Sequence, residues 1–161
     1  MSTLFKTLIV GVGATVVMDV FTFLLNLIGI KTLDYRLLGR WVGHMFKGRF
    51  SHQTIVDSLP LPYEQLIGWF THYAIGISFS FLLVAVVGDK WLESPSPLPA
   101  LVFGIVTIVA PFFLMQPAFG FGLAASNLPD PGKVRMLSFV IHAVFGMGLY
   151  LSAFLLALRT R

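Results

Sequence analysis

Four long apolar stretches constrain the fold of this chain more than any other feature of its sequence. They cover about residues 4–30, 63–88, 98–126 and 134–158. Each exceeds the roughly 20 residues that an α-helix needs to cross a hydrocarbon core. Hydrophobic residues make up 57% of the chain and charged residues only 11%, so a soluble fold could not bury the apolar surface. The sequence therefore predicts an all-α integral membrane four-helix bundle, formed as a single domain over residues 1–161.

The connection between the first two stretches, residues 31–62, is amphipathic in its first part. Its apolar residues recur at helical spacing and are Leu33, Leu37, Leu38, Trp41, Val42, Met45 and Phe46. Its cationic residues fall largely elsewhere on the helical wheel and are Arg36, Arg40, Lys47 and Arg49. This pattern predicts an amphipathic helix that lies in the membrane interface between spans 1 and 2.

Positive charge is divided unevenly between the two sides of the predicted bundle. Seven of the 11 Lys and Arg residues lie in or beside the first and third loops. Because cytoplasmic loops carry the excess of positive charge, we expect these loops in the cytoplasm and both termini outside. The cations flank apolar stretches and form no separate basic face. We therefore expect contacts with the bilayer and its anionic lipid headgroups, and no nucleic-acid partner.

The sequence offers few groups for catalysis. It has no cysteine, which excludes disulfides, thiolate metal sites and a cysteine nucleophile. The first connection does supply a hydroxyl, a base and acids through Ser51, His52, Asp57 and Glu64. Their spacing matches no known nucleophile arrangement, so we expect a solvated, headgroup-binding loop and no enzyme.

Four polar residues interrupt the apolar stretches, one in each: Asp19, His72, Gln116 and His142. A charge at the centre of a bilayer costs about 2.5–3.5 kcal/mol, so an ionisable residue there points to a function. Counted from the ends that face the first and third loops at 1.5 Å per residue, the four lie ~16, ~13, ~15 and ~12 Å deep. Their similar depth predicts a polar pocket that binds or moves a small ligand, a metal or a cofactor.

The residue types leave several uses for this pocket open. His72 and His142 could hold a b-type haem from both faces, or a divalent metal with Asp19 as a third ligand. Asp and His inside a membrane also mark proton relays, and a small proton-coupled transporter of this size would act as a homodimer. In a further alternative the chain is a structural or accessory subunit, and its buried polar residues only lock the helices together.

Two local features predict details of the helix ends. Pro111 and Pro117 should bend the third helix and free carbonyl groups near Gln116. Glu64 and Arg135 open the second and fourth helices on the same side, so we expect them to pair there.

Short motifs identify a family resemblance over nearly the whole chain. They include Gly13-Ala14-Thr15 with Met18-Asp19, Gly39-Arg40-Trp41 with Gly43-His44, Gly48-Arg49-Phe50 with His52, and Gly68-Trp69 with His72-Tyr73. They continue with Ala110-Pro111-Phe112-Phe113, Met115-Gln116-Pro117-Ala118, Gly120-Phe121-Gly122 and His142 with Phe145-Gly146. Through these motifs the chain resembles a bacterial membrane family catalogued as domain of unknown function 2938.

The resemblance implies a location in a bacterial inner membrane and implies no activity. Its motifs coincide with the predicted polar layer and with polar residues of the first connection. We therefore expect the ligand-binding site to reach from the middle of the membrane to the first-loop face. Its additional members there would be Arg40, His44, Arg49, His52 and Glu64.

Overall fold

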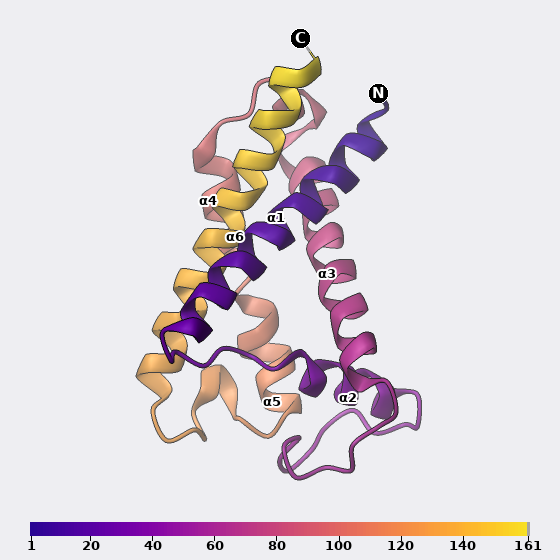
Figure 1. The fold of residues 1–161 in the computed structure, drawn as a ribbon, viewed down its shortest axis with the longest axis vertical. Helices are drawn as coiled ribbons and strands as arrows, with labels where there is room; N and C mark the ends of the chain where they lie inside the picture. The colour runs from indigo at the N-terminus through magenta and orange to yellow at the C-terminus, as the bar shows by residue number, and fades with distance from the viewer. Residues whose placement is uncertain (161) are drawn as a thin grey trace. The chain divides into compact units, whose positions relative to one another are not determined.

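The computed structural model describes residues 1–160, and this part of the chain is helical and contains no strand. Four helical segments are long and apolar enough to cross a membrane (Figure 1). They are α1 (Thr3–Leu27), α3 (Glu64–Val87), the segment Pro97–Ala118 and α6 (Pro131–Thr160). The predicted all-α fold with four apolar spans is confirmed.

Shorter elements complete the chain. Helix α2 (Tyr35–Met45) follows α1, and its N-cap Asp34 accepts a hydrogen bond from the backbone N–H of Arg36 at 2.9 Å. A short 3₁₀ helix, η1 (Asp89–Leu92), connects α3 to α4 (Pro97–Val106). The third span continues through the π-helix η2 (Pro111–Met115) and α5 (Gln116–Ala118), and the 3₁₀ helix η3 (Leu123–Ala125) precedes α6.

The third span is irregular where the two prolines predict a bend. Its α-helix stops at Val106, a turn follows at residues 107 and 108, and the helix that resumes at Val109 becomes a π-helix at Pro111. A proline has no N–H to donate to the preceding turn, which accounts for the irregularity. Helix α5 ends at Ala118, well before residue 126, where the apolar stretch ends. Gly120 and Gly122 have φ angles of +84° and +76°, which a glycine adopts without strain and which end the helix.

The contacts within the chain group it into two compact units. Unit 1 comprises Met1–Lys31, Tyr73–Thr107 and the chain from Phe139 on, and unit 2 comprises Thr32–His72 and Ile108–Ser138. Each unit has its own apolar core.

Unit 1 is itself a bundle of α1, the later part of α3, α4 and α6, packed through small residues. A Cβ on Gly11 of α1 would lie 2.7 Å from Cα of Ile77 in α3. A Cβ on Gly104 of α4 would meet the backbone of Gly146 in α6. Such close approach of backbones is typical of helices that associate in a membrane, where burial of apolar surface gives no driving force.

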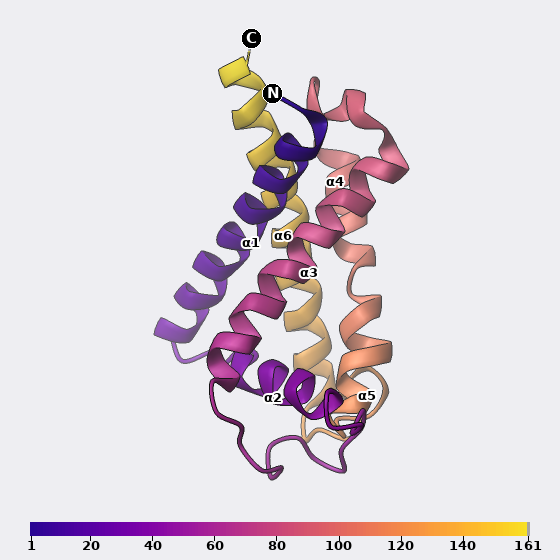
Figure 2. The same cartoon turned by 90° about the vertical axis from the view of Figure 1, so that its right-hand side faces the viewer.

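Unit 2 contains α2, the first part of α3, α5 and the irregular segments around them (Figure 2). Gly39 of α2 and Gly68 of α3 bring these two helices into backbone contact. Part of the apolar face of α2 is covered by the chain itself, because Leu38 and Trp41 pack against Ile55 and Phe119 in the core of unit 2.

The long first connection is fastened to the end of the third span. We call residues 50–58 of this connection the strap. The N–H of His52 donates to the carbonyl of Ala118 at 2.9 Å, and the N–H of Ile55 donates to the carbonyl of Phe119 at 2.9 Å. The strap thereby satisfies carbonyl groups that the end of a helix leaves without partners.

Candidate functional site

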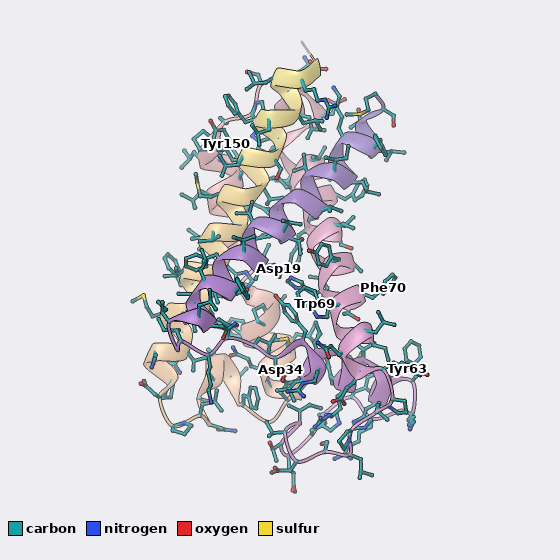
Figure 3. The ribbon with its side chains drawn as sticks, in the orientation of Figure 1. Asp19, Asp34, Tyr63, Trp69, Phe70 and Tyr150 are labelled. Carbon is teal, nitrogen blue, oxygen red and sulfur yellow. The ribbon has the colours of Figure 1, made fainter. Side chains whose placement is uncertain are left out.

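Asp19 lies on α1 and is paired inside unit 1 (Figure 3). Its carboxylate takes part in a hydrogen bond with the hydroxyl of Tyr73 on α3. A phenol O–H donates to an ionised carboxylate, and such a bond lowers the cost of a charge inside an apolar span. Tyr73 is therefore a partner of Asp19 that the sequence analysis did not identify.

His142 of α6 is held by Thr107, which directly follows α4 in unit 1. The hydroxyl oxygen of Thr107 lies 2.8 Å from Nδ1 of His142 and 2.6 Å from the carbonyl oxygen of Gly104. A hydroxyl has one proton, and the carbonyl of Gly104 accepts it. Nδ1 of His142 must then donate its N–H to Thr107, which leaves Nε2 as the basic nitrogen of the neutral ring.

His72 belongs to an aromatic cluster in unit 2. Nε2 of His72 lies 3.0 Å from the hydroxyl oxygen of Tyr35, and the two rings stack with centroids 4.2 Å apart. Trp69 meets the ring of Tyr35 edge to face at 4.8 Å. The N-terminal turn of α2 thus positions a histidine that belongs to the second predicted span.

Gln116 is the first residue of α5 and is only 6% exposed. Its Oε1 atom is buried and accepts no hydrogen bond from any residue within 1–160. An unsatisfied buried acceptor costs about 1–3 kcal/mol. The π-helix η2 ends at the residue before it, and π-helical turns occur frequently at functional sites.

The four residues of the predicted polar layer therefore divide between the units. Asp19 and His142 belong to unit 1, whereas His72 and Gln116 belong to unit 2. No group of three or more His, Asp or Glu that could hold a metal occurs among the described residues. The pocket of four, and ligation by His72 and His142, stay predictions.

Arg40 and Glu64 form a buried ion pair in unit 2. Nε and Nη2 of Arg40 each lie 2.9 Å from a carboxylate oxygen of Glu64. Nη1 lies within 3.1 Å of the carbonyl oxygens of Ile55, Val56 and Ser58. The side chain thus holds the strap to α2 and α3. The bond to Glu64 also raises the pKa of Arg40 above its ordinary value, so the guanidinium remains charged.

One prediction about these charges is wrong. Glu64 does not pair with Arg135, which donates from Nε to the carbonyl of Ala124 at 2.8 Å. The side chain of Arg40, which the helical wheel separates from the apolar residues of α2, is only 9% exposed. A buried arginine is stabilised only with full pairing, and the partners of Arg40 begin 15 residues further along the chain.

His44 and His52 are brought together in unit 2, as a pair. Nδ1 of His44 lies 2.8 Å from Nε2 of His52, and both residues are 6% exposed. Burial lowers the pKa of both imidazoles below the ordinary value, and the positive charge of Arg49 adds to the effect. Arg49 itself is exposed.

The neutral partners of the polar residues were not predicted from the sequence. Tyr35, Tyr73 and Thr107 each hold one of the predicted site residues, but no spacing marks these two tyrosines and this threonine as a set. Thr107 lies three residues after Gly104, where a hydroxyl reaches back to the helix carbonyl, and this spacing is the one local signal for it.

Comparison with known proteins identifies one family. A family model described as "Protein of unknown function (DUF2938)" matches residues 8–156, which is nearly the whole chain. No curated protein and no solved structure matches the chain.

Proposed function

The chain belongs to the DUF2938 family, and we propose that it is a membrane protein that binds a small polar ligand in its third span, with Gln116 as a ligand-binding side chain. The observation that carries this proposal is the buried Oε1 atom of Gln116. A leucine of similar volume would avoid the cost of burying this acceptor. A ligand that donates a hydrogen bond to Oε1 explains why a buried amide side chain occupies this position.

The backbone around Gln116 supports the same proposal. The π-helix η2 precedes Gln116 and Pro117 follows it, so both flanks depart from regular helical hydrogen bonding. Within the hydrocarbon core, irregular backbone is tolerated only where it is buried in protein or lines a cavity. A polar ligand stabilises such a segment, because its donors and acceptors replace those of water.

The chemistry of the amide limits the ligand to a class. Oε1 accepts a hydrogen bond from a hydroxyl, an amine or an amide, and it also binds hard cations. The cofactor-binding version of the proposal is a b-type haem or a divalent metal, for which His72 of unit 2 and His142 of unit 1 are the candidate imidazoles. The residues fit it in type, since imidazole binds both groups.

Native mass spectrometry of the full chain, extracted in detergent from the membranes in which it was produced, tests the proposal. We expect a co-purifying mass on the wild type that is lost from Gln116→Leu. It should remain on Gln65→Leu, which makes the same change at an exposed position of α3. An adduct that all three proteins share, or a bare chain in all three, contradicts a role for Gln116 in binding.

An absorption spectrum and a metal analysis of the same preparations test the cofactor-binding version. A Soret band, or one metal per chain, should disappear from both His72→Ala and His142→Ala. If only one of the variants loses it, the two histidines do not share a cofactor.

The same proposal includes a bacterial inner membrane, with the first and third loops in the cytoplasm. The excess of Lys and Arg in these loops supports that orientation. Lys47 and Arg49 are exposed and suit anionic headgroups. When a reporter that works only outside the cytoplasm is fused to the C-terminus, we expect it to be active. Activity of a reporter that works only in the cytoplasm overturns the orientation.

A further inference from the structure

The hydrogen bond between His44 and His52 determines how many N–H groups the two imidazoles have left for other partners. Each neutral imidazole has one N–H and one lone pair. The bond between Nδ1 of His44 and Nε2 of His52 uses one N–H and one lone pair. The rings also stack with centroids 5.0 Å apart, so neither can turn away without breaking this contact.

The two outer nitrogens of the pair both face backbone carbonyls. The carbonyl of Leu59 lies beside His44 and that of Ala118 beside His52, and each favours an N–H on the ring it approaches. A neutral pair has one N–H left for these two carbonyls. In the described chain, Nδ1 of His52 is the nitrogen without a well-formed hydrogen bond.

One additional proton would give the pair a positive charge that is buried and lies near the cationic side chains of Lys47 and Arg49. We propose that His44 and His52 together form a binding site for a single proton, and that its occupation loosens the strap at the end of the third span. This proposal is independent of a ligand at Gln116.

The charged groups around the pair oppose the proton. Arg40 on α2 and Lys47 and Arg49 in the segment after α2 all face the imidazoles and are cationic. The strap carries one carboxylate, Asp57, and the carboxylate of Glu64 on α3 is paired with Arg40, while the Ala118 segment contributes only its carbonyl. Burial acts in the same direction, and the pKa of both histidines therefore lies below the ordinary value. The pair is neutral at pH 7.5 and takes up the proton in acid.

The direction of the effect on stability follows because the pKa of these histidines is lower in the folded chain than in the unfolded chain. Between the folded and the unfolded pKa, the unfolded chain binds more protons than the folded chain. The stability that the neutral pair provides is therefore complete above about pH 6.5 and decreases as the pH falls through the folded pKa. The local contacts at risk are the two strap hydrogen bonds, from His52 to Ala118 and from Ile55 to Phe119.

Hydrogen exchange measured by mass spectrometry on the full chain in detergent tests the proposal. After correction for the intrinsic rate, peptides covering 50–58 and 118–121 should exchange faster at pH 5.0 than at pH 7.5, by about tenfold if the strap opens locally. Peptides within 145–155 of α6 should not change. His52→Gln keeps an amide donor and acceptor but cannot titrate, and it should abolish the difference.

A second variant keeps the test decisive if His52→Gln does not fold. Arg49 is exposed, and Arg49→Gln removes a cation that opposes the proton. It should move the midpoint of the exchange transition to higher pH. Equal protection of the wild type at both pH values, an unchanged difference in His52→Gln, or an unchanged midpoint in Arg49→Gln overturns the proposal.

Discussion

In unit 1 the helices meet backbone to backbone, whereas in unit 2 an irregular segment is held by charged and polar side chains. The contacts of unit 1 run through Gly11, Gly104 and Gly146, and its buried polar residues are neutral or bonded to neutral partners, as in the bonds of Asp19 with Tyr73 and of His142 with Thr107. Unit 2 buries the ion pair of Arg40 and Glu64 and the imidazole pair. Regular helices satisfy their own backbone and need only close packing, while an irregular segment needs partners for its carbonyls.

The largest expected effect comes from the side chain on which unit 2 depends. Arg40→Ala leaves the buried carboxylate of Glu64 unpaired and frees three carbonyls, so we expect it to lower the free energy of unfolding by about 3–5 kcal/mol. Unfolding in detergent by titration with sodium dodecyl sulfate measures the change.

The exposed pair of Asp34 and Arg36 provides the matched control for this prediction. The side chain of Arg36 is 59% exposed, and Arg36→Ala should cost no more than about 1 kcal/mol. Equal losses from the two arginines would show that the network of Arg40 does not hold unit 2.

An intermediate effect should follow from filling the helix contact of unit 1. In Gly104→Ala the new methyl group meets the backbone of Gly146, which cannot move without separating α4 from α6. We expect a loss of about 1–3 kcal/mol, as for overpacked cores. In Gly132→Ala the methyl group on α6 would make only an ordinary contact, 3.8 Å from Oδ1 of Asp130, and the change should be neutral or slightly stabilising. Similar values for both variants would mean that α4 and α6 do not depend on close approach.

The smallest effect belongs to a polar pair of unit 1. Thr107→Val keeps the shape of the side chain and removes the hydroxyl between His142 and Gly104. Hydrogen bonds between membrane helices contribute about 0.6 kcal/mol, and we expect a loss of that size. Ser78→Ala, at a hydroxyl that bonds only within its own helix, is the control. A loss several times larger would assign His142 a structural role beyond one hydrogen bond.

The sequence predicts the regular parts of this molecule better than the irregular ones. Length and hydropathy are properties of one segment, so the four spans follow from them directly. Pro111 and Pro117 predict the bend because proline acts on its own turn. The end of the third span is less predictable, since Phe119 and Phe121 are as apolar as the helix before them.

The partners of the polar residues were beyond prediction for a different reason. A helical wheel considers α2 alone and cannot identify the partner of Arg40, because Glu64 lies 24 residues away. The imidazole pair was predicted only as two members of a larger set, without their direct contact. Such contacts depend on where the long first connection packs in the folded chain, and a local sequence pattern does not contain that information.

The strap also has a consequence for the order in which the protein is made. Residues 52 and 55 leave the ribosome before the third span, and their N–H groups donate to Ala118 and Phe119 in the finished chain. Until that span is synthesised, these two amides have only water as a partner. The first connection therefore forms these two hydrogen bonds only after the third span has been inserted. Insertion of that span gives partners to the amides of the strap and to the carbonyls at the end of the third span in the same step.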